Sequence, residues 1–169
     1  MTIQKRVTRN HHDVDEYEAV HVLQLLTEDH RTVEQLFASF DEADGRARQG
    51  IADDALHAVE VHSAIEEKLV YPAIRKATGE EDLVDEAVEE HHVVKFMIKE
   101  LHKMKASVRG YRAKFTVLSE LVNHHIIAEE SEMFPKAEQS GVDWHTLGRE
   151  ALKMKDRMMK SSRRHRRAA

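Results

Sequence analysis

The sequence predicts an all-α protein, built as an antiparallel up-down four-helix bundle with a short fifth C-terminal helix. Apolar residues recur at spacings of three, four and seven in four stretches of similar length. The 169 residues include only two prolines and six glycines, and a sequence with few helix breakers favours long helices. The sequence has no sustained alternation of apolar and polar residues with a period of two, which would indicate strands. Short connections between the stretches favour antiparallel neighbours.

The predicted helices follow from these stripes of apolar residues, each lying along one face of a helix, and from the glycines and prolines between or within them. Gly45 and Gly50 indicate a polar loop after the first helix, and Pro72 should kink the second. Pro135 should kink or end the fourth. The four bundle helices are expected over residues 17–40, 53–77, 81–105 and 112–134, and the amphipathic fifth over residues 144–158.

Three parts are expected: a flexible segment over residues 1–16, the bundle over 17–140, and an amphipathic helix with a basic tail over 141–169. The last nine residues, 161–169, are predicted to be disordered. The stretch 151–169 carries eight Lys or Arg and one acid, which leaves 18 basic and 30 acidic residues before it. An acidic body is a poor general binder of nucleic acid, so no nucleic-acid partner is expected.

The composition excludes several kinds of site. The chain has no cysteine, which excludes disulfide scaffolds, thiolate zinc sites, iron–sulfur clusters and cysteine nucleophiles. The sequence shows no secretory signal and no apolar run of membrane-spanning length. We therefore expect a cytoplasmic protein with no membrane partner. Thirteen histidines are the unusual feature that the composition leaves to be explained.

A motif occurs twice in the chain. It reads His, then two Glu at positions four and five, then an aromatic residue and Pro at positions nine and ten. One copy begins at His62 and the other at His125. Upstream of each lies a single histidine preceded by an acid, His30 and His91. The two halves are therefore predicted to be copies of one helical hairpin, offset by 61 to 63 residues.

Ionisable residues interrupt the apolar stripes at matching depths in the two hairpins. Burying them without partners would be very costly, and bound metal cations would remove that cost. Imidazole and carboxylate together suit iron, manganese or zinc. We expect one metal in each hairpin, with Glu66 and Glu129 bridging the two. The predicted ligands are His30, His62, Glu66, His91, His125 and Glu129.

The number of ligands leaves room for a small molecule. Two octahedral metals offer about twelve positions, and four imidazoles, two bridging carboxylates and one bridging oxygen fill about ten. About one position on each metal stays open, and O2, hydrogen peroxide or nitric oxide could bind there.

The order His, His-x-x-x-Glu, His, His-x-x-x-Glu resembles the hemerythrin-like, or HHE cation-binding, family over about residues 17–140. The resemblance implies an antiparallel four-helix bundle with two non-haem iron ions, oxo- or hydroxo-bridged. It also implies an activity among reversible O2 binding, O2 or iron sensing, nitric-oxide handling and peroxide decomposition.

The sequence departs from the oxygen-carrying members at one position. Those proteins have a second histidine in the third helix, where this chain has Lys95. The shorter ligand set resembles bacterial hemerythrin-like proteins, some of which act on peroxide. In that group the tyrosine before the proline of the second helix can approach the iron, which makes Tyr71 a candidate catalytic residue. Phe134 takes its place in the second repeat.

Some neighbouring residues leave alternatives open. A helix turned by one residue would put His92 or His124 in place of its neighbour. Glu67 and Glu130 are expected to support the ligands or to face solvent, although Glu130 could replace Glu129. His57 is expected on the surface, and His102 at the end of the bundle.

Three functions are compatible with the sequence. The first is a di-iron enzyme acting on peroxide or nitric oxide, and the second is an O2- or iron-sensing module without turnover. The third is a metal-free structural bundle. The chain has no Gly-rich flavin or nicotinamide signature, so any reductant would be external.

Overall fold

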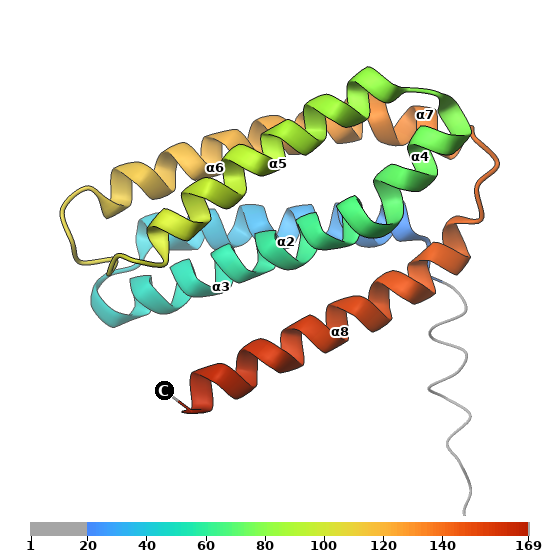
Figure 1. The fold of residues 1–169 in the computed structure, drawn as a ribbon. Coiled ribbons are helices and arrows are strands. Elements are labelled where there is room, and N and C mark those ends of the chain that lie inside the picture. The colour runs from blue at the N-terminus through green and yellow to red at the C-terminus, as the bar shows by residue number, and fades with distance from the viewer. Residues whose placement is uncertain (1–19, 169) are drawn as a thin grey trace, which may run out of the picture.

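The computed structural model describes residues 20–168, with side chains up to Ser161. Its described part contains no strand, and helices lie side by side as a bundle in Figure 1. The predicted all-α bundle with a C-terminal helix is confirmed, whereas the predicted flexible segment 1–16 lies outside the described residues. The long bundle helices are α2 (Val22–Glu42), α3 (Gly45–Ile65), α5 (Glu81–Leu101) and α6 (Tyr111–Ala128).

Each hairpin pairs two of these helices, α2 with α3 and α5 with α6. The shorter helices α4 (Tyr71–Thr78) and α7 (Phe134–Glu138) continue α3 and α6 at one end of the bundle (Figure 1). Helix α8 (Trp144–Ala168) packs along the outside, on α2 and α3. The first hairpin is therefore covered by α8 on one side, and no described helix covers the second in the same way.

Several boundaries differ from the sequence prediction. Helix α2 begins at Val22, so residues 20 and 21 of the predicted helix 17–40 are not helical. The expected polar loop at Gly45 and Gly50 is wrong, because α3 begins at Gly45 and runs through Gly50. Arg48 explains the early start, since its guanidinium binds the carbonyl of Ala43 and lies 5.6 Å from the centre of the Phe40 ring. Helix α5 ends at Leu101 rather than residue 105.

The prolines shift the helical register instead of ending the helix. Pro72 and Pro135 each lack the backbone N–H that a helix would use. In each copy an aromatic residue precedes the proline, and the five residues before that aromatic residue form a π turn, η1 (Glu66–Val70) and η2 (Glu129–Met133). The chain then continues as α-helix, so the fourth helix does not stop at residue 134. A π turn inserts one residue into the helical repeat and turns the following side chains.

The C-terminal helix is longer than predicted. It begins at Trp144 as expected, where the Asp143 carboxylate accepts the backbone N–H of Thr146 at 3.0 Å and caps the helix. It continues past Met158 to Ala168, so the disorder predicted for residues 161–169 is wrong as far as Ala168.

The apolar core is divided into two clusters with the polar residues between them. One cluster, at the α4 and α7 end, contains Tyr71, Phe134 and Trp144. The other, at the opposite end, contains Phe37, Phe40, Tyr111 and Phe115, of which Phe40 and Phe115 stack with ring centroids 3.9 Å apart. The described helices include none that is both long and apolar enough to cross a membrane.

We expect Gly148→Ala to destabilise the protein by about 1–3 kcal/mol. A methyl group at Gly148 would lie 2.0 Å from the backbone oxygen of Val20, so either α8 or the start of α2 must move. The matched control is Gly50→Ala, in a helix with nothing within 4 Å, which should stabilise the protein by about 1 kcal/mol. Urea unfolding measures both, and equal effects would contradict close backbone packing at Gly148.

Candidate metal centre

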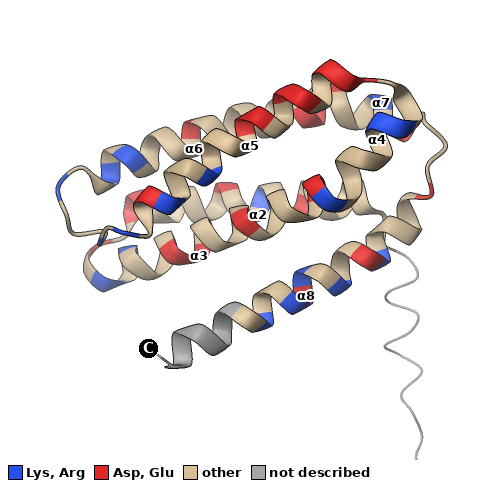
Figure 2. Ribbon diagram, viewed as in Figure 1, with Lys and Arg blue, Asp and Glu red and all other residues tan. Residues whose placement is uncertain are grey.

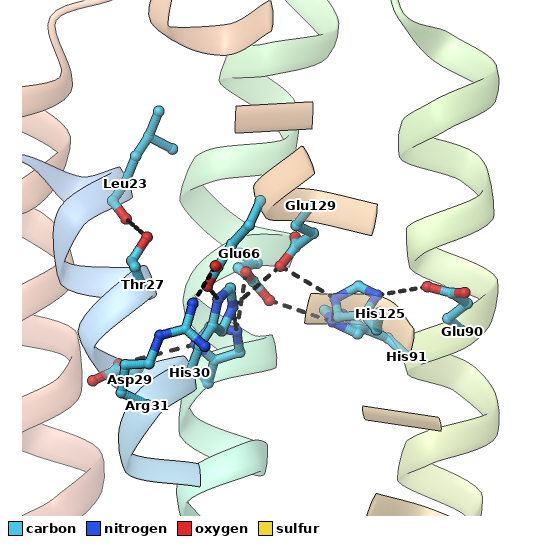
Figure 3. Close-up of polar contacts among 12 residues, drawn as sticks. Leu23, Thr27, Asp29, His30, Arg31, Glu66, Glu90, His91, His125 and Glu129 are labelled. Carbon is cyan, nitrogen blue, oxygen red and sulfur yellow. Dashed lines mark hydrogen bonds and ion pairs between the residues drawn. The ribbon is translucent and has the colours of Figure 1, made fainter. Parts of the chain in front are cut away.

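The structure brings the six predicted ligands together at the middle of the bundle (Figure 3). All six side chains are buried, and Glu66 is 0% exposed. Their ligand atoms form two groups in which every atom lies within 4.8 Å of the others, and Glu66 belongs to both groups. The first group is His30, His62, Glu66 and Glu129, and the second is Glu66, His91 and His125.

The histidines face each other in pairs, one pair in each hairpin. The Nε2 atoms of His30 and His62 are 3.0 Å apart, as are those of His91 and His125. Two unprotonated ring nitrogens at this distance would repel each other, so each pair needs a proton or a cation between its members. The same arrangement suits two imidazoles that bind one metal.

The two carboxylates connect the pairs. One oxygen of Glu66 is 3.1 Å from His62 Nε2, and the other is 3.3 Å from His91 Nε2. On Glu129, Oε2 lies 3.3 Å from His30 Nε2 and 3.5 Å from His125 Nε2. Each carboxylate therefore reaches both halves of the site, which is the position that the sequence predicted for bridging ligands.

The outer nitrogens of the imidazoles are held by other acids. Glu130 lies 2.7 Å from His30 Nδ1, and Glu67 lies 3.0 Å from His91 Nδ1. Each of these acids comes from the opposite hairpin, so the hairpins orient one another's first histidine. A carboxylate on Nδ1 directs Nε2 inward as the ligand atom. Glu67 and Glu130 thus support the ligands, as one of the two open interpretations proposed.

Sequence reasoning missed the partners of the other two histidines. Glu90 lies 2.6 Å from His125 Nδ1, as Figure 3 shows. The equivalent acid, Asp29, stays 4.0 Å from His62 Nδ1, which has no hydrogen-bond partner among the described residues. Asp29 is one methylene shorter than Glu90 and forms an ion pair with Lys155 of α8. The signal was present in the sequence, because each of these acids directly precedes a predicted ligand.

The structure also decides between the neighbouring residues. The side chains of His92 and His124 are 80% and 74% exposed, so neither replaces its buried neighbour. Lys95, which stands where oxygen carriers have a histidine, points outward to Glu67. His102 is exposed and contacts Glu60, while His57 is only partly exposed.

Tyr71 reaches the centre of the site. It is 2% exposed, and its hydroxyl donates a hydrogen bond of 2.8 Å to Glu129 Oε1. The same hydroxyl lies 3.4 Å from His91 Nε2 and 3.3 Å from His125 Nε2. Burial, together with the charges of Glu66 and Glu129, raises the pKa of Tyr71 well above its ordinary value. The hydroxyl therefore keeps its proton and acts as a donor.

The electrostatics of the site fit bound cations. Burial works to raise the pKa of Glu66, but His62 and His91 hold it well below its ordinary value. Both oxygens of Glu66 and one of Glu129 lack a hydrogen-bond donor within the described part of the chain. Ionised carboxylates in a dry core need positive charge nearby. The donor set of imidazole nitrogen and carboxylate oxygen suits iron, manganese or zinc.

Tyr71→Phe should destabilise the metal-free protein by about 1–3 kcal/mol, because it leaves a buried oxygen of Glu129 without its donor. The matched control is Tyr111→Phe. Tyr111 is also fully buried, but its hydroxyl has no hydrogen-bond partner in the described structure, so its removal should cost nothing or stabilise. Urea unfolding of both variants checks this, and an equal loss would remove the assigned role of the Tyr71 hydroxyl.

The stability of the metal-free protein should fall between pH 6.5 and 9. Burial lowers the pKa of His125, but Glu129, Glu90 and Glu66 together raise it to about 9, against 6.5 in an unfolded chain. A raised pKa stabilises the fold fully below pH 6.5, and this contribution disappears as the pH rises through 9. Metal-loaded protein should not follow this fall, since cations replace the proton. Unfolding curves across this range test both forms, and parallel curves would contradict the assignment.

Comparisons with known proteins agree with this geometry. The family model described as the hemerythrin HHE cation-binding domain matches residues 21–137. A crystal structure of a hemerythrin HHE cation-binding domain-containing protein from Mycobacterium kansasii is 25% identical, with a TM-score of 0.72. The match covers 84% of this chain and 89% of that chain. Among curated proteins, none matches. The chain belongs to the hemerythrin HHE cation-binding domain family.

Proposed function

We propose that this protein binds two non-haem iron ions and reacts with a small oxidant, most simply by decomposing hydrogen peroxide, or by handling nitric oxide or O2. Metal binding itself follows from the family and from the buried His and Glu groups. One observation carries the proposal of a pair: Glu66 belongs to both ligand groups, with one oxygen directed at each half. A shared carboxylate is how helical bundles hold two irons close together.

The open positions support a reactive centre rather than a purely structural one. Iron supplies reversible electron transfer and coordination sites that a small molecule can occupy. Lys95 points away from the site, so the second pair has no third imidazole from α5. Four imidazoles and two shared carboxylates leave positions free on two metals of octahedral preference.

A small cavity below the histidines favours a small reactant. Its volume is about 10 Å³, close to the minimum that holds one water molecule. Apolar side chains of Val33, Val59, Val94 and Val122 line it beside the four histidines. A cavity of this size suits a molecule about as large as water, and its apolar walls would limit the water beside bound metals.

The Tyr71 hydroxyl supports the proposal as a hydrogen-bond donor at the site. Its hydroxyl is held on Glu129 Oε1 and lies within 3.4 Å of two ligand nitrogens. A phenol in this position could donate a hydrogen bond to a small reactant in the site, while its raised pKa keeps the proton on the tyrosine.

Electron balance favours peroxide among the candidate oxidants. Two molecules of hydrogen peroxide yield one O2 and two water molecules, so one peroxide is oxidised while the other is reduced. Reduction of O2 or nitric oxide consumes electrons from an external donor. The sequence carries no flavin or nicotinamide signature that would supply them.

Protein produced in iron-replete medium should contain two irons per chain by elemental analysis. It should also evolve O2 from hydrogen peroxide. His62→Ala and His125→Ala should each lose iron, because each removes a buried ligand. His92→Ala and His124→Ala, which change exposed neighbours, should keep both irons. A protein with no metal, or equal losses in all four variants, would reject the proposal.

The alternative is an O2- or iron-sensing module without turnover. It is favoured by the ion pair between Lys155 of α8 and Asp29, which precedes the predicted ligand His30. This contact connects the outer helix to the metal site. An iron-loaded protein that neither evolves O2 nor consumes nitric oxide, but whose α8 changes in protease sensitivity with oxidation or metal removal, would favour sensing.

A further inference from the structure

An open groove leads from the surface to the second half of the site. It lies between α5 on one side and α6 with η2 on the other, and its volume is about 180 Å³. Glu86, His124 and Glu132 line its outer part, and all three are exposed. His125 and Glu129, two of the predicted ligands, line its inner part. The groove therefore joins solvent to ligand residues that are themselves buried.

The repeat shows that the polar lining of this groove is particular to the second hairpin. With the offsets of 61 and 63 residues, Glu86, His124 and Glu132 correspond to Leu25, Val61 and Leu69 in the first hairpin. Those three apolar residues pack in one cluster with Ala151, Leu147, Met154 and Met158 of α8. The equivalent residues of the first hairpin are thus apolar and packed against α8, whereas those of the second are polar and line an acidic groove.

Charge makes the open groove attractive to cations. Glu86, Glu90 and Glu132 line it, and acidic residues crowd this end of α5 in Figure 2. Lys136 offsets part of this charge through ion pairs with Glu132 at 3.0 Å and Glu80 at 3.1 Å. A recess lined by one sign of charge raises the local concentration of the opposite ion.

A second observation points to a cation at the inner end. Glu129 lines the groove, is 1% exposed, and its Oε2 atom accepts no hydrogen bond from any described residue. This oxygen lies 3.5 Å from His125 Nε2. An ionised oxygen without a donor in a buried position is a site that a metal cation would satisfy.

We propose that this groove is the entrance through which a divalent metal cation reaches the buried site, with Glu86 and Glu132 as its first contacts. The proposal rests on the proposed metal binding. From the outer carboxylates the cation would pass Glu90 and His124, whose side chains lie 3.7 Å apart, and arrive at Glu129 and His125. Because α8 packs over the equivalent apolar residues of the first hairpin, loading would proceed from the second hairpin.

Another acidic recess provides a matched control. It lies between α2 and α7, with Glu28, Glu130 and Glu138 in its lining. Its lining includes none of the six predicted ligands, and it ends on Phe134, whose ring stacks on His30 with centroids 5.8 Å apart. Neutralising Glu28 and Glu138 removes the same charge from the protein without changing the proposed entrance.

The test measures how fast metal-stripped, full-length protein takes up Co²⁺ in a stopped-flow instrument, using the ligand-field absorption of bound Co²⁺. Circular dichroism first confirms that each stripped protein is helical. The double variant Glu86→Gln/Glu132→Gln should take up Co²⁺ about tenfold more slowly than the unaltered protein. Its final stoichiometry should be unchanged. Uptake by Glu28→Gln/Glu138→Gln should match the unaltered protein.

Salt provides a second measurement on the same proteins. The uptake rate of the unaltered protein should fall as ionic strength rises, and that of the entrance variant should fall less, since salt screens the charges that attract the cation. Equal rates in all three proteins, or equal slowing in both variants, would overturn the entrance while leaving metal binding intact. If the entrance variant binds fewer Co²⁺ ions per chain than the unaltered protein, Glu86 or Glu132 is a metal ligand, and this result would also overturn the proposed entrance. Unaltered protein that binds no Co²⁺ and no iron would reject the proposed function as well.

Discussion

Two carboxylates and four imidazoles buried in one layer of the bundle form the constraint on which the rest of the structure depends. The side chains of Glu66 and Glu129 are almost fully withdrawn from water, and three of their four oxygens lack hydrogen-bond donors in the described structure. Such a layer is unfavourable unless cations or protons neutralise it. Apolar clusters on both sides hold the layer in place. The fold is therefore stable only if positive charge lies beside these six side chains in the core.

The π turns position side chains of this buried layer. In η1 the backbone N–H of Tyr71 bonds to the carbonyl of Glu66, five residues earlier. A turn of this width places residues five apart on the same face. Glu66 and the Tyr71 hydroxyl therefore both point into the site, which a regular α-helix would not achieve. In η2 the same geometry puts Phe134 below Glu129, where it stacks on His30 and supplies no proton.

Much of the site could be predicted from sequence, because His and Glu four apart on an amphipathic helix share a face whatever the helix packs against. The buried places of His62, Glu66, His125 and Glu129 followed from that local rule. The sequence could not decide whether Glu67 and Glu130 support the ligands or face solvent, since their contacts cross between the hairpins. The path of the helix around Pro72 could not be predicted either. A proline permits a kink, an end or a π turn, and tertiary packing decides among them. The early start of α3 depends similarly on a tertiary contact, in which the side-chain oxygen of Gln49 accepts a hydrogen bond from the backbone N–H of Ala106.

The two hairpins share a ligand pattern but have diverged around it, and this gives the site two unequal halves. In the second half, Glu90 orients His125 through a contact of 2.6 Å, and an acidic groove reaches the surface. In the first, α8 packs over the equivalent residues, Lys155 binds Asp29, and His62 Nδ1 has no hydrogen-bond partner among the described residues. An imidazole with a carboxylate on its outer nitrogen is a more basic and better fixed ligand. A symmetric arrangement of buried His and Glu residues is therefore placed in an asymmetric protein, in which α8 covers one half and an acidic groove approaches the other.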